Sequence, residues 1–293
     1  MLTMMPILAV LAGATPATPP ENTIPPSWSQ PHKPFRVHGD TYYVGSQGLT
    51  ALLITSPKGH VLIDVPMAEN ADLIEANIRS LGFKIEDVRI VLNSHAHHDH
   101  AGGIAKLVRD SGAVVHASAH SAVLLKSGGD DASDPQHGLA ATFPAVSPVS
   151  VVADGETIRI GPNAFTAHAT PGHTPGSTTW TWQSCEGEQC LEMVYADSLT
   201  AMGAPSYRYG DPAHPHRVAD FRRGLEMLKN LPCDLLITPH PEASGFFERI
   251  ARKDRGEPEA LHAAGACRSY AEGAADRLEK RLADEQKSAG AMP

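Results

Sequence analysis

The hydrophobic positions along the chain follow two alternating kinds of pattern. Short runs rich in β-branched, aliphatic and aromatic residues, separated by glycine and proline, predict strands. These runs are residues 42–44, 50–55, 60–65, 88–92 and 113–117, then 149–152, 156–160, 164–169, 178–182, 191–196 and 234–238. Apolar side chains at helical spacing predict helices over residues 70–81, 102–109, 217–228 and 271–283. Two β-rich halves, each followed by helices, favour two sheets packed face to face with helices outside, because a doubly wound sheet would alternate strand and helix more strictly.

Two segments depart from this pattern. Residues 125–148 are polar and rich in glycine, aspartate and proline, which predicts a long surface excursion of the kind that often binds ligands. Residues 4–14 are apolar and have the length of a signal-peptide core, although no lysine or arginine precedes Lys33. We predict a signal peptide over residues 1–17, with a disordered or misassigned start as the alternative. The proline-rich residues 15–26 predict an extended linker.

Composition places the rest of the chain among ordinary globular proteins. Of its 293 residues, 42% are hydrophobic and 19% are charged, which is enough to bury a large core. A net charge of -9 argues against a nucleic-acid surface, and no apolar run reaches the length of a membrane span. We see neither a long-period repeat nor a second domain. We therefore expect neither nucleic acid nor membrane as a partner, and take a monomer as the default.

Four cysteines allow three pairings. Cys185 and Cys190 flank a short polar tip, which predicts a disulfide across a hairpin. Our preferred second pair is Cys233 with Cys267, since one precedes a predicted strand and the other lies in the C-terminal segment. An even number of cysteines behind a signal peptide favours an oxidising compartment, so the protein is expected to be periplasmic or secreted. Four reduced, buried cysteines in a cytosolic enzyme are the alternative.

The run HAHHDH at residues 95–100 follows the apolar strand 88–92 directly. Imidazole and carboxylate are zinc ligands, and a catalytic zinc ion typically has three protein ligands and a water. Because alternate residues at a strand end point the same way, His95 and His97 can share one ion. Asp99 and His100 lie one step further and can turn toward a second ion. His98 has the wrong parity and is expected to face solvent or to support a ligand. An exposed polar loop is the alternative for the whole run.

Two ions with three ligands each require two more side chains, which we expect at other strand ends. His173, in the turn-rich segment TPGHTPG, follows the predicted strand 164–169, and His240 follows the strand 234–238. His214 and His216 lie in a proline-rich loop and could approach the site, although solvent exposure is the stronger expectation.

Together, H-x-H-x-D-H, TPGHTPG, YADS at 195–198 and TPH at 238–240 resemble the metallo-β-lactamase superfamily over almost the whole chain after the linker. The resemblance implies an α/β fold: an αββα sandwich of two mixed β-sheets with helices on the outer faces and metals at one edge. The implied ligands are His95, His97 and His173 for the first ion and Asp99, His100 and His240 for the second.

One position points to a subclass. Where the best-known zinc β-lactamases have a cysteine thiolate on the second ion, this chain has Ser198, as the third subclass of class B does. In that subclass hydroxyl groups are thought to hold a water near the metals, so Ser198 and Thr200 become candidates for binding water or substrate. Ordinary strand-end hydrogen bonding is the alternative for both. The cysteine pair at 233 and 267 also matches, and residues 28–35 resemble a lid. The predicted organisation is therefore a signal peptide (1–17), a linker and lid (18–34) and one catalytic domain (35–293).

The resemblance implies a secreted hydrolase with two Zn²⁺ ions that opens the β-lactam ring of penicillins, cephalosporins and carbapenems and so confers antibiotic resistance. Two such ions lower the pKa of a shared water to near 7, and Asp99 is expected to orient the resulting hydroxide. The chain has no G-x-S-x-G or S-x-x-K serine-nucleophile motif. The main alternative is a thioester or lactone hydrolase similar to glyoxalase II, in which Asp197 would bridge both metals. A zinc-binding protein without catalysis is a second alternative.

Overall fold

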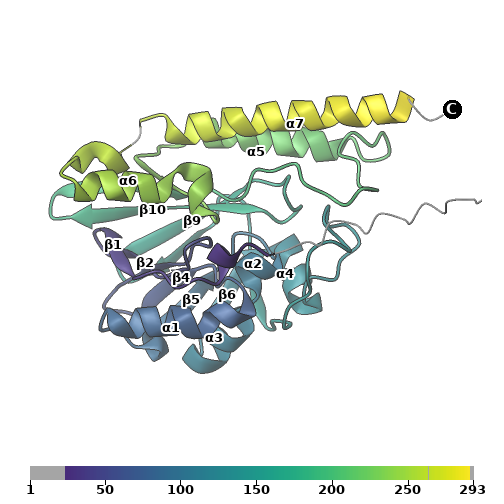
Figure 1. The fold of residues 1–293 in the computed structure, drawn as a ribbon. Helices are drawn as coiled ribbons and strands as arrows, with labels where there is room; N and C mark the ends of the chain where they lie inside the picture. Colours follow the sequence, from purple (N-terminus) through teal and green to yellow (C-terminus); the bar gives the residue numbers. More distant parts are fainter. Residues whose placement is uncertain (1–23, 263, 291–293) are drawn as a thin grey trace, which may run out of the picture.

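The computed structural model describes residues 24–262 and 264–290, so the predicted signal peptide and the first part of the linker lie outside the described residues. The chain forms two mixed sheets (Figure 1). The strands of the first sheet, in spatial order, are β1 (Phe35–His38), β2 (Thr41–Tyr43), β3 (Leu52–Ile54), β4 (His60–Ile63), β5 (Val88–Leu92), β6 (Val114–Ser118) and β7 (Val149–Val152). The strands of the second sheet are β12 (Leu235–Ile237), β11 (Gln189–Tyr195), β10 (Thr178–Glu186), β9 (Asn163–Ala169) and β8 (Thr157–Ile160).

Each sheet consists of one antiparallel part and one parallel part. The first sheet is antiparallel from β1 to β4 and parallel from β4 to β7. The second sheet is antiparallel except where β11 pairs in parallel with β12. Parallel neighbours end at the same edge of a sheet, so β4 to β7 all end at one edge of the first sheet, and β11 and β12 end at one edge of the second.

Helices cover the outer face of each sheet. Against the first sheet lie α1 (Ala71–Ser80), α3 (Ile104–Ser111) and α4 (Ala119–Ser127). In Figure 1, α5 (His216–Asn230) and α7 (Ala266–Gly290) run side by side over the second sheet, and α6 (Phe246–Asp254) lies near β1 and β10. Three apolar clusters fill the spaces between these layers. This arrangement confirms the predicted αββα sandwich.

The alternation of side chains along β11 shows how one strand serves two of these clusters. Leu191, Met193 and Tyr195 point between the sheets, where they pack with Trp180 of β10. The intervening Val194 faces the opposite way, toward α5 and α7. Strict alternation is expected because successive side chains of a strand leave on opposite faces of the sheet.

The helix predicted over residues 102–109 begins at Ile104 in the structure, and a separate short helix precedes it. A short helix α2 (His98–Ala101) is followed by Gly102, Gly103 and then α3. A Cβ atom at Gly102 would lie 2.9 Å from the backbone nitrogen of Ala68, and one at Gly103 would lie 2.7 Å from Val65 Cγ1. The two glycines therefore allow the chain after the histidine run to pack closely against the segment that follows β4.

The hydrophobic pattern of the sequence does not predict β1, α4 or α6, and the C-terminal helix is longer than the predicted 271–283. Two disulfides are present, Cys185–Cys190 across the β10–β11 hairpin and Cys233–Cys267 between the segment before β12 and the start of α7. They are the two preferred pairs. Among the described residues, none of the helices has both the length and the apolar character needed to span a membrane.

Candidate metal centre

The six predicted metal ligands come from segments that leave strands at one edge of the sandwich. The chain leaves β5 and reaches the histidine run through a turn, and α2 begins at His98. His173 lies in the loop between β9 and β10, and His240 follows β12. Although these segments are far apart in sequence, the two sheets bring them together at this edge.

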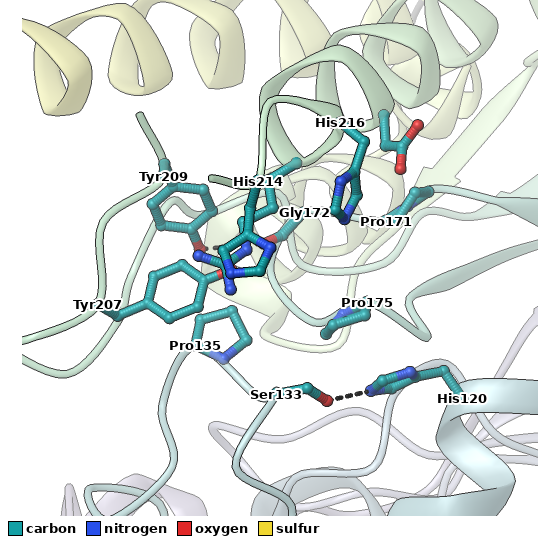
Figure 2. A pocket seen from close by; sticks show the side chains of 12 residues that line it. His120, Ser133, Pro135, Pro171, Gly172, Pro175, Tyr207, Tyr209, His214 and His216 are labelled. Atoms are coloured by element: carbon teal, nitrogen blue, oxygen red, sulfur yellow. Dashed lines mark hydrogen bonds between the residues drawn. The ribbon is translucent and has the colours of Figure 1, made fainter. Parts of the chain in front are cut away.

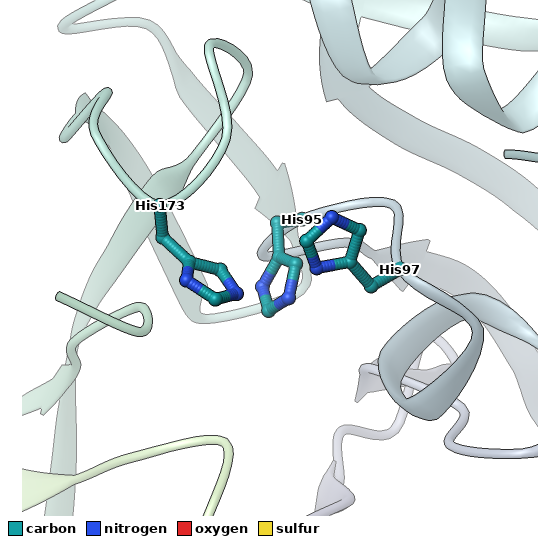
Figure 3. A group of neighbouring side chains, drawn as sticks. All are labelled: His95, His97 and His173. Carbon is teal, nitrogen blue, oxygen red and sulfur yellow. The ribbon is translucent and has the colours of Figure 1, made fainter. Parts of the chain in front are cut away.

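His95, His97 and His173 are buried and form a first group. They offer ligand atoms that all lie within 4.8 Å of one another. Their ring centroids are 4.8 to 5.0 Å apart, and the ring planes cross at 77° to 90°. In Figure 3 the three rings converge on one point, from the segment after β5 and from the loop after β9. Steeply crossed rings can each direct one nitrogen at a common ion.

Each of these rings has its other nitrogen next to an acceptor. The contacts are His95 Nδ1 with Asp197 Oδ1 at 2.7 Å, His97 Nε2 with Asp134 Oδ1 at 3.1 Å, and His173 Nδ1 with Thr200 Oγ1 at 2.8 Å. Such acceptors fix the ring orientation and tautomer of metal-binding histidines. One nitrogen of each ring is left to face the centre, and among the described residues the buried His95 Nε2 has no hydrogen-bond partner.

Asp99, His100 and His240 form a second group. Asp99 Oδ2 lies 3.1 Å from His100 Nε2 and 3.5 Å from His240 Nε2, and the two imidazole nitrogens are 3.3 Å apart. Zinc bonds of about 2.0–2.1 Å at tetrahedral angles place neighbouring ligand atoms about 3.4 Å apart. The three distances therefore fit one ion. Ligand atoms of His95, Asp99 and His100 also lie within 4.8 Å of one another. We place His95 in the first group, because it also lies close to His97 and His173.

The electrostatics of three of the proposed ligands suit metal binding. Burial, with neighbouring imidazoles, holds the pKa of His95 and His173 well below the usual range, so both are neutral at pH 7. Burial alone would raise the pKa of Asp99, but His100 and His240 outweigh it and hold that pKa well below its usual range. Neutral imidazoles and an ionised carboxylate are the protonation states that bind a divalent cation.

A buried carboxylate supports the turn that carries the histidine run. Asp64 accepts hydrogen bonds from the backbone N–H and hydroxyl of Ser94, from the Asn93 amide and from the Tyr195 hydroxyl. Its φ of 57° is the positive value that a turn at the end of β4 requires, and it is the only such value among the described non-glycine residues. Asp64 thus ties the end of β4 to the residues immediately before His95.

The predicted accessory residues take different places. Thr200 contacts the ring of His173, and Ser198 is buried next to Asp197. The ring of His98 lies 6.3 Å from that of Trp28, which in turn lies 5.2 Å from the ring of His240. The predicted lid segment therefore reaches the second group of ligands.

Sequence reasoning missed two residues of the site, Asp134 and Gln136. Besides the Asp134 contact with His97, Gln136 Nε2 lies 3.3 Å from His173 Nε2. Both belong to residues 125–148, for which the sequence predicts a long surface excursion of the kind that often binds ligands, but the spacing of residues there does not indicate which side chains face inward. His214 and His216 belong to neither ligand group and line a neighbouring cavity of about 360 Å³ (Figure 2).

Comparison with known proteins agrees with this geometry. A sequence model of the metallo-β-lactamase superfamily matches residues 44–186. The Rm3 metallo-β-lactamase is 47% identical, with a TM-score of 0.86 over 89% of this chain and 97% of its own. The chain belongs to the metallo-β-lactamase superfamily. Within this superfamily it is also similar to MEM-A1, a subclass B3 metallo-β-lactamase from a soil metagenome, at 47% identity and a TM-score of 0.86 over 89% and 99% of the two chains.

Two further relatives are less similar to this chain. MIM-1 from Novosphingobium pentaromativorans is 46% identical, with a TM-score of 0.84 over 89% of this chain and 94% of its own. A hydroxyacylglutathione hydrolase from Anaeromyxobacter dehalogenans is 30% identical over 190 residues, which are 60% of this chain and 61% of that protein. The chain thus spans about three fifths of the length of this curated relative.

Proposed function

We propose that this protein is an exported β-lactamase with two zinc ions, which opens the β-lactam ring of penicillins, cephalosporins and carbapenems and confers resistance to them. The observation that carries the proposal is the similarity to metallo-β-lactamases along nearly their whole length, at 47% identity over 97% of Rm3. By contrast, the hydroxyacylglutathione hydrolase is only 30% identical to this chain, and the match covers 61% of that protein.

We assign His95, His97 and His173 to the first ion and Asp99, His100 and His240 to the second. The donor set of five imidazoles and one carboxylate is typical of zinc, and three protein ligands per ion leave a coordination position open for catalysis. Two adjacent zinc ions supply Lewis-acid polarisation and an activated water to the reaction. Asp99 is then both a ligand and the group that orients that water.

The remaining residues of the site position and enclose the substrate. The amide of Gln136 lies at the face of His173 that is turned to the centre, where it can donate a hydrogen bond to a polar group of the substrate. Trp28 covers His240 from the N-terminal segment and would shield the site from water on that side. Ser198 and Thr200 remain candidates for holding a water, with Thr200 also fixing the ring of His173.

The thioester or lactone hydrolase is the second candidate. One observation favours it: Asp197 Oδ2 is buried and has no hydrogen-bond partner among the described residues. A carboxylate oxygen that binds metal would also be left without a hydrogen-bond partner when the metal is absent. Against it, Asp197 Oδ1 is 2.7 Å from His95 Nδ1, the nitrogen that does not face His97 and His173 in our assignment. A carboxylate held behind a ligand supports that ligand, and this position favours the β-lactamase.

Turnover assays separate the two candidates. Purified protein loaded with zinc is offered a penicillin, a cephalosporin, a carbapenem, a glutathione thioester and a lactone. We expect hydrolysis of the β-lactams, its loss after chelation and its return when zinc is added back. Rapid cleavage of the thioester or the lactone without β-lactam turnover would overturn the proposal in favour of the second candidate.

Export to the periplasm or the medium is part of the same proposal. It is supported by the two disulfides and by the apolar residues 4–14 of the sequence. Fractionation of cells that express the full chain, with mass analysis of the exported protein, tests the location, the cleavage near residue 17 and the oxidation of all four cysteines. Gel filtration of the same material tests the expected monomer.

A further inference from the structure

We propose that Tyr209 is a positioning residue for the ligand His173, and that Glu285 of the C-terminal helix α7 holds Tyr209 in place for this role. The proposal rests on the proposed metal centre, because it takes His173 to bind the first ion. It does not depend on which substrate the enzyme hydrolyses.

The hydroxyl of Tyr209 reaches the backbone immediately before the ligand. It lies 2.9 Å from the carbonyl oxygen of Gly172 and 3.0 Å from that of Met202, and donates its single proton between them. Figure 2 shows Tyr209 directed at Gly172 across one wall of the cavity. Tyr209 is 1% exposed, so water does not reach these hydrogen bonds and cannot readily take the place of the hydroxyl. Tyr209 therefore holds the peptide unit to which His173 is attached.

Packing leaves this peptide unit little freedom on its other side. A Cβ atom at position 172 would lie 2.4 Å from the ring of Phe221, so Gly172 is in close contact with α5. The ring of His173 is fixed separately, because its Nδ1 contacts Thr200. The segment from Thr200 to Tyr209 thus contacts the ligand loop twice, once at the ring and once at the backbone.

Glu285 in turn fixes Tyr209. Its carboxylate accepts hydrogen bonds from the backbone N–H groups of Tyr209 at 3.0 Å and Gly210 at 2.9 Å, and from Arg281 at 2.7 Å. Arg208 also donates to the backbone carbonyl of Glu285. A carboxylate with three donors, at 7% exposure, holds the position of the chain at Tyr209 more firmly than a surface contact would.

The helix that carries Glu285 is anchored along its length. The Cys233–Cys267 disulfide attaches its first turn to the segment before β12. Ala271, Ala274 and Leu278 are buried in the cluster that α7 shares with α5. The contacts therefore form a continuous path from the C-terminal helix through Glu285, Tyr209 and Gly172 to His173.

Zinc affinity tests the proposal independently of turnover. Full-length protein and its variants are titrated with zinc against a chromophoric chelator, which resolves the first and second dissociation constants. For Tyr209→Phe we expect one of the two constants to rise about 3- to 10-fold, the effect of losing one hydrogen bond, while the other is unchanged. Glu285→Gln should raise the same constant.

Tyr207→Phe is the matched control. Its ring lies 5.1 Å from that of Tyr209 and lines the same cavity, but its hydroxyl has no hydrogen bond to the part of the chain that the structure describes. Its zinc affinities should equal those of the unsubstituted protein. A general loss of stability would weaken both sites together, whereas loss of the positioning role should weaken only one.

The outcomes separate this proposal from the one on which it rests. If the unsubstituted protein binds no zinc, the metal centre and the positioning role both fail. If it binds two ions, and Tyr209→Phe and Glu285→Gln leave both constants unchanged or weaken both sites equally, only the positioning role fails. Selective weakening of one site by both variants, absent in Tyr207→Phe, would establish it.

Discussion

Asp134 is the residue whose support of the metal centre can be isolated most cleanly. Its carboxylate lies 3.1 Å from His97 Nε2, and the partnership holds the pKa of Asp134 below its usual range even though burial alone would raise it. Asp134→Asn keeps the shape but removes the charge that orients the imidazole. We expect zinc affinity at one site to fall about 10-fold, measured by competition with a chelator.

Asp131→Asn is the control for this change. Asp131 belongs to the same loop and accepts hydrogen bonds from Ser133, without contact to any of the six proposed ligands. It should leave zinc affinity unchanged. Equal weakening by both variants would show that the effect comes from the loop as a whole and not from the contact with His97.

A residue of the site can be predicted from the sequence when it is part of a recognisable local motif. His95, His97, Asp99 and His100 form a dense pattern at the end of an apolar strand, so spacing alone groups them. Asp134 stands among other acidic residues in an irregular loop, and only its distance from His97 in the folded chain distinguishes it. Supporting residues depend on contacts across the molecule, which no local pattern encodes.

At the scale of the elements, the contacts of Glu285 on α7 predict how the stability of the fold depends on pH. Burial alone would raise the pKa of Glu285, but Arg281 and two backbone N–H groups outweigh it and lower that pKa below its usual value. Because the folded-state pKa is below the unfolded one, the ionised carboxylate stabilises the fold at neutral pH, and this stability is lost as pH falls through the folded-state pKa. Glu285→Gln should therefore cost about 2 kcal/mol at pH 7, with a difference that shrinks in acid.

Thermal unfolding of metal-free protein as a function of pH measures this effect. Glu279→Gln provides the comparison on the same helix, because Glu279 pairs with Arg222 while both side chains are more than half exposed. An exposed pair of this kind contributes little. A pH-independent loss of stability in Glu285→Gln would show that the charge of Glu285 is not what stabilises α7.

The two disulfides are expected to stabilise the fold unequally. Cys233 and Cys267 are 34 residues apart, whereas Cys185 and Cys190 are 5 apart. The entropy removed from the unfolded chain grows with the closed loop, so replacing the first pair by serine should cost about 4 kcal/mol and replacing the second about 2 kcal/mol. Denaturant unfolding of the two metal-free double variants compares them, and a larger loss for the short loop would contradict the prediction.

Of the elements that the hydrophobic pattern does not predict, α4 lacks a clear hydrophobic period. In α4, Val123 is 54% exposed while Ser121 and Ala122 are buried, so apolar and buried positions do not coincide. The signal that was present lies at its start, where Ser118 accepts a hydrogen bond from the backbone N–H of Ser121 as an N-cap. By contrast, α5 places Phe221, Leu225 and Leu228 on one buried face, and its pattern predicted it correctly.

For the molecule as a whole, the arrangement of its cores bears on what the metals do for stability. Three apolar clusters fill the spaces between the four layers, and none of them includes a proposed metal ligand. The proposed ligands occupy one edge, on turns held by contacts such as those of Asp64 with Ser94 and Tyr195. The fold therefore has a metal-independent source of stability, unlike small domains that fold only on binding zinc.

Removing the metals should accordingly abolish β-lactam hydrolysis while leaving the sandwich folded. Chelated protein is expected to keep its far-ultraviolet circular dichroism and cooperative thermal unfolding, with a lower Tm because zinc binds the native state only. Returning zinc should restore both activity and Tm. If the chelated protein instead lost its secondary structure, the close approach of the His97, His100 and His173 imidazoles to that of His95 would have to be destabilising enough, without ions, to outweigh the three clusters. The metal centre would then be a structural element of this fold as well as its catalytic one.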